Sequence, residues 1–584
     1  MTDTNETSSD ESEPVPDGGV ADSDVFMSEE QGAEYRSTVY EDVGYDTLEE
    51  APQTDEFPNL GKGPSLKKYD LPKVPKLSHL VGPSAIMLGA SLGSGETMFW
   101  PTIIAQSGWA LYWAFWVGVL TQFFINTELQ RWTLATGESI FRAFDRMHMV
   151  WPWFFLAAGF FQAGWPGWAA GASKVAASWA GLGTGAWPVI GIITMIVIWL
   201  SYQAGPVVYN IVETTQTVLM ILAVVFAVIL VFLAGTIGQL ANVPAGAVSF
   251  GTLPADMNIA VFLGGLAYAG AGGYVNLAQG VWAREKGYGM GTYQGRIQNP
   301  LRGSEPEEVT DGYTFEPNEK NLTRWKAWWK VAQQEHFLSF VVGLLVVATI
   351  AMTISAEYAA GTEVGAIDMW LTEIIPALSP IAAQLTYAVI FIALFSTQYA
   401  IIESYVRNSV DIMFEGHGRQ AGWEVSRVFL GFLTLYTVWG IAIIGGNLLF
   451  ENFSKPWILL VIGAAAAGAM MWPYNALTTI LNTKYLPEHT QMGWARIVAM
   501  WWATGFFGYF TVLLVGGIAT GDQYGINFAA LDTTVGIVGS GPLGYVLWVV
   551  FAIVQVYVMY VSGKAKLESQ GTVEGADKAR GLLS

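Results

Sequence analysis

The sequence predicts an all-α polytopic membrane protein, and three observations support this fold class. First, 52% of the 584 residues are hydrophobic and only 13% are charged, a balance that is unusual for a soluble domain. Second, the apolar residues form twelve segments that can each cross a hydrocarbon core of about 30 Å. Third, glycine clusters interrupt two of these segments near their middle. We therefore expect a bundle of twelve transmembrane helices.

The distribution of basic residues predicts how the spans are oriented. Loops assigned to the inside carry many Lys and Arg residues, whereas those assigned to the outside carry Lys455 alone. Because basic residues favour cytoplasmic loops, this asymmetry predicts a multi-pass cell-membrane protein with both termini in the cytoplasm. The expected spans are 80–103, 109–130, 149–178, 185–203, 210–235, 257–282, 335–355, 379–406, 426–447, 456–483, 494–519 and 540–562.

Charge and composition divide the chain into regions. The formal net charge is −20, and many of the acidic residues precede Pro58. This segment has few large apolar residues, so burial cannot offset the entropy lost on ordering it. We expect a disordered acidic cytoplasmic tail over 1–66, with a cytoplasmic protein as a possible partner. The other expected regions are 80–235 (first repeat), 257–483 (second repeat, with cytoplasmic loop 283–334), 494–562 (two additional spans) and 563–584 (C-terminal tail).

The two glycine clusters indicate where a site lies. Leu92–Glu96 interrupts the first span and Gly270–Tyr274 interrupts the sixth. A helix unwound inside a bilayer exposes backbone groups that lipid cannot satisfy, so a break is tolerated where it lines a polar cavity. Two breaks in matching positions, five spans apart, are typical of secondary transporters built from inverted repeats.

Ionisable residues inside the spans are the next candidates, because an unpaired charge is costly in a membrane. Glu96 lies at the first break, where it is either a cation or proton site or a cap of the second half-helix. Glu403 and Arg407 have the i, i+4 spacing of an ion pair, and coupling-ion chemistry is an equal alternative for Glu403. Lys174 is expected to balance one buried carboxylate. Gln398 adds a polar side chain to the eighth span.

Several short motifs match the pattern of one known family, and they are Gly82-Pro83-Ser84, Gly93-Ser94-Gly95-Glu96, Gln106 to Trp113, Leu129 to Glu138, Tyr209 to Glu213 and Pro473. Through these motifs the chain resembles the Nramp family of divalent-metal transporters. The resemblance spans roughly residues 80–490. It implies a LeuT-type fold, in which two inverted five-helix repeats are followed by two extra helices.

The departures from the family pattern are equally informative. The family has Asp-Pro-Gly-Asn where this chain has Gly93 to Glu96, so the metal-binding Asp is missing and the Asn position holds a carboxylate. Ala271-Gly272-Gly273 replaces the family's Met-Pro-His, which removes the thioether and the histidine. Tyr268 matches the position whose backbone carbonyl the family uses. The chain thus looks like a divergent Nramp-related branch without the usual metal-binding motifs.

Oxygen ligands favour hard cations such as Mg²⁺ and Mn²⁺, whereas a thioether favours softer metals. We therefore expect a transporter of Mg²⁺ or Mn²⁺, in which Glu96 is the metal ligand and the ion is substrate, with no permanently bound cofactor. Symport with protons would use Glu96 or Glu403. The expected partners are membrane lipid and a small ion, and not nucleic acid. The expected substrate-site residues are Gly93, Ser94, Gly95, Glu96, Tyr268, Ala271, Gly272, Gly273, Asn276 and Gln398.

Other functions remain open at this level. A cavity between half-helices also suits an amino acid or amine, and aromatic side chains at Phe99, Trp100, Tyr268 and Tyr274 facing the site would favour such a substrate. A sensor that binds a ligand without transporting it is a second alternative. An enzyme is not expected, since the chain has no His-Glu-x-x-His zinc motif and no serine nucleophile elbow.

Overall fold

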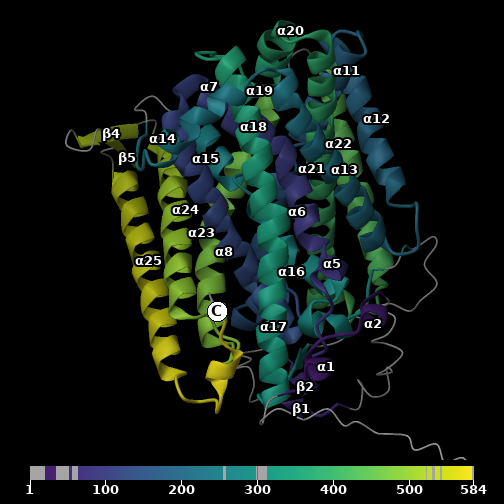
Figure 1. Ribbon diagram of the computed structural model, residues 1–584, viewed down its shortest axis with the longest axis vertical. Coiled ribbons are helices and arrows are strands. Elements are labelled where there is room, and N and C mark those ends of the chain that lie inside the picture. Colours follow the sequence, from purple (N-terminus) through teal and green to yellow (C-terminus); the bar gives the residue numbers. More distant parts are fainter. Residues whose placement is uncertain are drawn as a thin grey trace, which may run out of the picture.

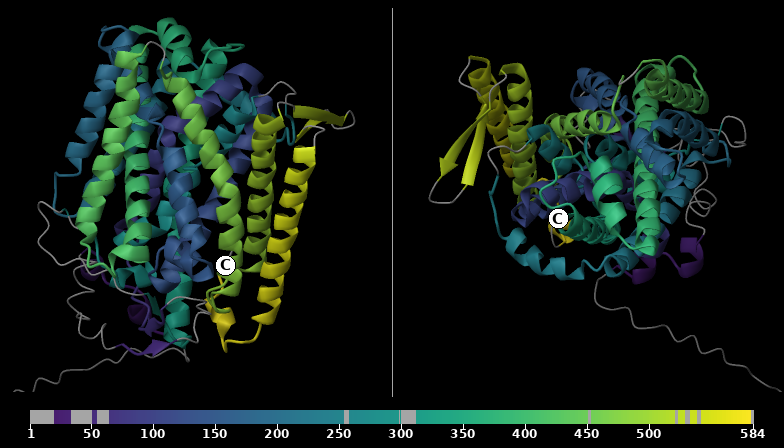
Figure 2. Two further views of the ribbon diagram at one scale, coloured as in Figure 1. Left: turned by 180° about the vertical axis from the view of Figure 1, so that it is seen from behind. Right: turned by 90° about the horizontal axis from the view of Figure 1, so that it is seen from above.

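The computed structural model shows a bundle of long helices that run along one common direction (Figure 1). Figure 2 shows the same bundle from behind and from above, with the last two long helices at its periphery. The structure describes residues 20–33, 51–54, 64–253, 258–297, 299, 312–450, 453–520, 523–528, 533–538 and 542–581.

Helices occupy all of the expected spans in the first half of the bundle. Span one is built from three consecutive helical segments, and span three contains a short interruption at Gly164 to Pro166. The elements are α5 (Leu77–Leu80), α6 (Pro83–Ser91), η1 (Leu92–Phe99), α7 (Trp100–Ser107), η2 (Trp109–Leu111), α8 (Tyr112–Thr136), α9 (Ile140–Met147), α10 (Val150–Ala163), α11 (Gly167–Trp179), η3 (Thr184–Ala186), α12 (Trp187–Ser201), α13 (Val208–Leu233), η4 (Ile237–Asn242) and α14 (Val243–Ala247).

The second half follows the same pattern, with span six divided into two helices. Its elements are α15 (Ile259–Ala267), α16 (Gly273–Lys286), η5 (Gly289–Tyr293), β3 (Tyr313–Thr314), α17 (Glu319–His336), η6 (Phe337–Val342), α18 (Gly343–Tyr358), α19 (Ala366–Asp368), η7 (Met369–Ile374), α20 (Ile375–Ala377), α21 (Pro380–Met413), η8 (Phe414–Gly418), α22 (Val425–Leu449), α23 (Pro456–Lys484), α24 (Trp494–Thr520), β4 (Gln523–Phe528), β5 (Thr533–Val538) and α25 (Pro542–Glu568). Within the described residues, eight helices are long and apolar enough to cross a membrane by length and composition.

The two expected breaks differ in structure. The second is a true interruption, in which Gly270, Gly272 and Gly273 have φ values of 156°, 66° and 55°. Such positive values are readily adopted only by glycine. The first segment, Leu92–Phe99, is not unwound but forms a π-helix that continues α6 into α7. The expectation of an unwound first span is therefore wrong, because an i to i+5 helix accommodates the glycines without losing the helical path.

The seventh span is longer than expected. The basic and aromatic residues from Arg324 to Lys330 suggest a helix lying flat at the membrane interface. Instead, α17, η6 and α18 form one continuous helical segment from Glu319 to Tyr358, which runs along the bundle in Figure 1. Trp328 explains the difference, because its side chain is buried and its Nε1 donates to the Pro72 carbonyl at 2.8 Å.

The described segments nearest the two termini lie at the same end of the bundle (Figure 1). Near the N-terminus lie α1 (Asp22–Val25), α2 (Glu29–Ala33) and a sheet of β1 (Gln53–Thr54), β2 (Leu66–Lys68) and β3, whose β1–β2 pairing is antiparallel and whose β2–β3 pairing is parallel. Near the C-terminus, η9 (Ala576–Ala579) contacts α17 through a Lys578–Glu319 ion pair of 2.8 Å. The membrane side on which these ends lie stays a prediction.

Parts of the acidic N-terminal segment differ from the expected disorder. Arg324 on α17 donates to the Asp24 carbonyl at 2.6 Å, and Val25 is buried. A hydrogen bond of 3.0 Å from the amide of Met27 to the Val74 carbonyl adds a second contact. These bonds attach residues 20–33 to the bundle. Residues 1–19, 34–50 and 55–63 lie outside the described part of the chain, so the prediction of disorder there stays a prediction.

Candidate functional site

The π-helix η1 lies at the centre of the bundle and is in close contact with two other helices. A Cβ atom built on Gly95 would lie 1.5 Å from the carbonyl oxygen of Tyr268 at the end of α15. A Cβ built on Gly93 would lie 2.4 Å from the carbonyl oxygen of Ala393 on α21. Neither Gly93 nor Gly95 has a positive φ angle. The two glycines therefore serve to let backbones approach, rather than to supply an unusual backbone conformation.

Three expected site residues gather around Trp168 on α11. Its Nε1 donates to the Ser94 hydroxyl at 2.5 Å, and its ring lies 5.6 Å from the ring of Tyr268. The next residue, Ala169, donates its amide to Gln398 Oε1 at 3.0 Å. Ser94, Tyr268 and Gln398 are all fully buried. Residues from four helical elements thus converge beside η1.

Glu96 lies in this region with no protein partner. The residue is fully buried, and in the part of the chain that the structure describes neither carboxylate oxygen accepts a hydrogen bond. Among the described residues no basic side chain pairs with it, whereas Glu128, Glu285 and Glu403 each pair with a buried arginine. An ionised carboxylate in this environment costs several kcal/mol. Glu96 must therefore be neutralised by a proton or by a bound cation.

The backbone freed by the α15–α16 break is satisfied by two glutamine side chains. Gln122 on α8 donates Nε2 to the carbonyls of Leu266 and Ala267 at 3.0 and 2.6 Å. Gln162 on α10 accepts from the amide of Tyr274 at 2.7 Å. The Ser91 hydroxyl donates to the Gly270 carbonyl. These contacts replace the helical hydrogen bonds that the break removes, as a buried backbone requires.

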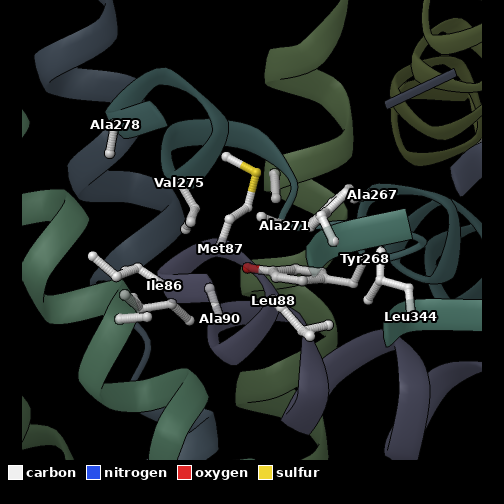
Figure 3. Close-up of a cluster of buried hydrophobic side chains, with 14 of the residues drawn as sticks. Ile86, Met87, Leu88, Ala90, Ala267, Tyr268, Ala271, Val275, Ala278 and Leu344 are labelled. Carbon is white, nitrogen blue, oxygen red and sulfur yellow. The ribbon is translucent and has the colours of Figure 1, made fainter. Parts of the chain in front are cut away.

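Asn276 belongs to this second group. Its Nδ2 donates to Gln122 Oε1 at 3.3 Å and to the Tyr474 hydroxyl at 3.0 Å, whereas its Oδ1 has no partner in the described structure. Ala271, Gly272 and Gly273 form the break itself. Figure 3 shows Ala271 and Tyr268 in one buried cluster with Met87 of α6. The expected site residues therefore form two groups, one around Trp168 and one around Gln122. The end of α15 connects them, because Tyr268 lies beside Trp168 and the carbonyls of Leu266 and Ala267 bind Gln122.

The expected ion pair in the eighth span is present and is larger than predicted. Arg407 Nε donates to Glu403 and its guanidinium also pairs with Glu285 of α16. All three side chains are buried. Glu403 is thus held by a cation, which favours the structural interpretation over coupling-ion chemistry.

Lys174 has a different partner from the one expected. It pairs with Asp368 of α19 at 2.5 Å, and the Asp368 side chain is 44% exposed. The expectation that Lys174 balances a buried carboxylate is therefore wrong. The reason is its position on the last turns of α11, at the bundle end opposite to the chain termini (Figure 1).

A chain of ion pairs ties the end of α16 to its neighbours. Arg284 pairs with Asp411 at 2.9 Å, Glu285 with Arg407, and Lys286 with Glu213 of α13 at 2.5 Å. Three consecutive residues thus hold α16 against α21 and α13.

At the opposite end, a cavity of about 590 Å³ opens between α11, α12, α19 and α23. Lys174, Asp368, Trp187 and Trp457 are among its lining residues. The Trp457 ring lies 5.3 Å from the ring of Phe99, the last residue of η1. One ring that lines the cavity, Trp457, is therefore in contact with the last residue of the π-helix through a tilted aromatic pair.

The donor set suits a small cation held by oxygen atoms. Across the described residues, no group of three or more His, Cys, Asp or Glu side chains could hold a metal ion. Glu96 supplies a carboxylate within η1, and the same region of the bundle holds the hydroxyl of Ser94, the carboxamide of Gln398 and the backbone carbonyl of Tyr268. Such a set provides a single negative charge and several oxygen ligands.

Three residues of this region are missing from the sequence-based site. Gln122 and Gln162 bind the backbone at the break, and Trp168 binds the Ser94 hydroxyl, but none of the three lies at a glycine break or is ionisable. A signal exists for the two glutamines, because isolated carboxamides in apolar spans normally have a buried partner. Trp168 carries no such signal, since the chain contains 25 tryptophans.

Comparison with solved structures shows the fold. A mutant of the Eremococcus coleocola manganese transporter matches with a TM-score of 0.57 and 9% identity, over 85% of this chain and 97% of that chain. The same transporter in complex with an aromatic bis-isothiourea compound matches with a TM-score of 0.56 and 10% identity over the same shares. The protein is a multi-pass membrane protein with the LeuT-type fold. No protein-family model and no curated protein matches the sequence.

In the LeuT-type fold, two inverted five-helix repeats are followed by two further helices. The assignment of 80–235 and 257–483 to the two repeats stays a prediction, in which α6 to α7 and α15 to α16 begin the repeats and α24 and α25 follow the second. A third solved structure, a nucleobase-cation-symport-1 family transporter with bromovinylhydantoin bound, has a TM-score of 0.45 and 11% identity over 86% of this chain and 95% of that one.

Proposed function

We propose that the protein is a secondary transporter that moves a hard divalent cation, Mg²⁺ or Mn²⁺, by alternating access. The observation that carries this proposal is Glu96, a fully buried carboxylate without a protein partner in the described structure. It lies in η1, the counterpart of the α15–α16 break. In this fold, substrate and ion sites lie where the first helices of the two repeats meet. The solved manganese transporter with the same fold adds support.

The packing around η1 favours an ion over an organic substrate. The backbones at Gly95 and Tyr268 are in direct contact, so this closed arrangement has no space for an amino acid or amine between them. The aromatic residues that would favour such a substrate are dispersed. Trp100 donates its Nε1 to the Gly265 carbonyl at 2.8 Å, and Tyr274 packs on Gly159 and Tyr405. Phe99 ends η1 and pairs with Trp457, so of this group Tyr268 alone meets η1 at Gly95 in the described structure.

The ligand chemistry favours a hard cation. The polar groups around η1 are oxygen and amide groups, and the chain has no cysteine. Mg²⁺ and Mn²⁺ prefer carboxylate, carbonyl and water ligands. With one carboxylate beside η1, part of the charge of a divalent ion stays uncompensated. This residual charge limits the affinity of the site, so that the ion can leave again, as transport requires.

A proteoliposome flux assay tests the proposal. Purified protein is reconstituted, and entry of Mg²⁺, Mn²⁺ and Ca²⁺ is followed with sensitive dyes under imposed proton or sodium gradients. We expect saturable entry of Mg²⁺ or Mn²⁺, and we expect Glu96→Gln to abolish it while the purified variant stays folded and monodisperse. The gradient that accelerates entry identifies the coupling ion.

The matched control is Glu357→Gln, which makes the same change at an exposed position of α18. This variant should transport like the unmodified protein. Unchanged uptake by Glu96→Gln would contradict the assignment of Glu96. Absence of flux for every divalent ion, from folded protein, would instead indicate an organic substrate or a sensor.

A further inference from the structure

A buried polar cluster joins α6, α16 and α17, away from η1. Its members are Ser84, Gln279, Glu335 and His336, and each of them is at most 1% exposed. Glu335 accepts a hydrogen bond from the Ser84 hydroxyl and bonds of 3.3 and 3.5 Å from the amides of Ser84 and Gly82. This carboxylate thus caps the N-terminus of α6 from a different helix, where negative charge is favoured.

The hydrogen-bond chemistry of the cluster determines the tautomer of His336. The single proton of the Ser84 hydroxyl goes to Glu335, because a carboxylate can only accept. The Ser84 oxygen therefore accepts from its other neighbours. His336 Nδ1 lies 2.8 Å from this oxygen and must donate to it, and Gln279 Nε2 donates to the same oxygen at 3.4 Å. The second ring nitrogen, Nε2, consequently carries a free lone pair.

This free nitrogen is buried and has no partner. Across the described residues, His336 Nε2 and Gln279 Oε1 make no hydrogen bond. The imidazole ring stacks between Phe340, at 4.5 Å, and Phe123, at 5.9 Å between ring centres. Buried polar atoms are normally satisfied by protein or by ordered water. The ring is thus fixed in orientation, with a proton acceptor directed away from Ser84.

The face of α8 that holds Phe123 carries further unsatisfied groups. Asn126 and Gln130 lie three and seven residues after Phe123, which places them on the same side of the helix. Both side chains are fully buried, and none of their amide atoms has a partner in the described structure. Carboxamides in this state require water molecules. They add unsatisfied polar groups to the face of α8 on which Phe123 contacts the ring of His336.

The charged and titratable groups facing the cluster come from three helices. Tyr209 and Glu213 of α13 approach Gly82, where a Cβ atom would lie 2.8 and 2.9 Å from their oxygens. Lys286 of α16 interacts electrostatically with the Glu335 carboxylate, and Glu285 of α16 interacts with Tyr209. Lys286 and Glu285 each have an ion-pair partner as well. Arg496 of α24 interacts electrostatically with His336 and forms an ion pair of 2.7 Å with Glu128. No cation forms a direct ion pair with Glu335 among the described residues.

We propose that His336, Ser84 and Glu335 form a proton relay that holds the coupling proton of the transporter. This inference rests on the proposed transport function. A proton arriving from water binds to His336 Nε2, while the proton on Nδ1 passes to the Ser84 oxygen and the Ser84 hydroxyl proton passes to Glu335. Overall, one proton enters at His336 and one proton is stored on Glu335, so the atoms and the charge balance. Afterwards every hydrogen bond in the chain is reversed.

The position of Glu335 links this proton to movement of α6. The ionised carboxylate binds the amide groups at the N-terminus of α6, and its protonation removes the negative charge that they stabilise. α6 continues directly into η1, which contains Glu96. Protonation of Glu335 therefore weakens the attachment of α6 to α17 and allows the helix that carries the cation site to move.

Infrared difference spectroscopy tests the relay without requiring transport. Purified protein is cycled between about pH 5 and pH 8, and the stretching band of protonated carboxylic acids is recorded. We expect a band that Glu335→Gln removes and that Ser84→Ala shifts, because the acid loses its hydrogen-bond partner. A band that is unchanged in Glu335→Gln would overturn the proposal, whether or not the protein transports a cation.

Proton entry into proteoliposomes tests the role of the imidazole. His336→Asn keeps a donor to Ser84 but lacks the second ring nitrogen, so we expect it to lower cation-dependent proton entry at least tenfold. Its matched control is His148→Asn, at an exposed position before α10, which should be without effect. Normal proton entry in folded His336→Asn would overturn the relay. Ser84→Thr keeps the hydroxyl and should preserve the Glu335 band if the relay exists.

Discussion

At the scale of the residue, the contact between Gly95 and Tyr268 sets a strict limit on side-chain size. A methyl group at Gly95 would lie 1.5 Å from a backbone oxygen, which cannot rotate away as a side chain could. We expect Gly95→Ala to separate η1 from α15 and to abolish transport with a clear loss of thermal stability. Size-exclusion profiles and melting temperatures of the purified variant measure this effect.

Gly431→Ala is the matched control for this prediction. Gly431 is also helical, in α22, but no atom lies within 4 Å of a Cβ built there. Alanine has a higher helix propensity than glycine, so this variant should be as stable as the unmodified protein or slightly more stable. A Gly95→Ala protein that melts and transports normally would show that the two backbones separate easily.

Gln122 makes a second prediction at this scale. Its side chain satisfies the carbonyls of Leu266 and Ala267 and accepts from Gly272 and Asn276. Gln122→Leu keeps a similar volume but leaves these groups without partners, at about 1–3 kcal/mol for each. We expect a marked decrease in melting temperature and loss of transport. Gln570→Leu, at an exposed position, is the control and should change neither quantity.

At the scale of the element, α16 is held by ion pairs from three consecutive residues. The Lys286–Glu213 pair is the most accessible of them, with side chains 17% and 21% exposed. Removing it with Lys286→Ala should loosen α16 from α13 and increase its opening. The chain has no cysteine, so a single cysteine introduced by Ala278→Cys on buried α16 reports on opening through its rate of labelling by a water-soluble thiol reagent.

We expect Lys286→Ala to accelerate this labelling roughly fivefold, which corresponds to about 1 kcal/mol. Glu213→Gln should have the same effect, and the double variant should add nothing to either single change. Lys564→Ala, which removes an exposed pair with Glu568 at 3.6 Å, should leave the rate unchanged. Equal labelling rates in all variants would show that this ion pair does not hold α16.

The segment that connects α23 to α24 supports a prediction about pH. Burial lowers the pKa of His489 to about 3, and an unfolded chain has a histidine pKa of about 6.5. Above that value both states are neutral and the full stability is present. As the pH falls below about 6.5 the unfolded state binds a proton that the folded state does not, so stability decreases by about 1.4 kcal/mol per pH unit.

His489→Gln removes this titration. We expect the melting temperature of the unmodified protein to fall more steeply between about pH 7.5 and pH 5 than that of the variant. Thermal unfolding of both proteins at the two pH values measures the difference. Parallel decreases in both proteins would show that His489 is protonated in the folded state.

At the scale of the whole molecule, the N-terminal segment and the C-terminal segment both attach to α17. Arg324 binds the Asp24 carbonyl, and Lys578 pairs with Glu319. These contacts lie far from η1 along the bundle (Figure 1). Deletion of residues 1–60 should therefore lower the melting temperature by a few degrees and leave cation flux intact.

A point variant distinguishes the loss of contacts from the loss of acidic residues. Val25 is buried where α1 meets the bundle, so Val25→Asp should reproduce the decrease in melting temperature without changing the length of the chain. A clear loss of flux on deletion, with no effect of Val25→Asp, would indicate that the acidic segment regulates transport.

Apolar periodicity and glycine placement were sufficient to predict much of this protein. The twelve expected spans coincide with helices, the Gly270–Gly273 break is present, and the Glu403–Arg407 pair forms at its predicted spacing. These features depend on local backbone preference and on the length of chain that a bilayer requires. Residues that are neighbours along one helix can be paired from their spacing alone.

The remaining features depend on which helices become neighbours, and only the tertiary structure decided them. The glutamines that satisfy the break and the His336–Ser84–Glu335 chain join residues from different spans, and the π-helix at Leu92–Phe99 packs closely on α15 and α21. Spacing along the sequence contains no measure of such distances. The sequence therefore determined the membrane class, the spans and Glu96 as a candidate, whereas packing of the bundle determined which polar atoms meet inside it and left Glu96 without a partner in the described structure, because each buried group must find its partner across helices.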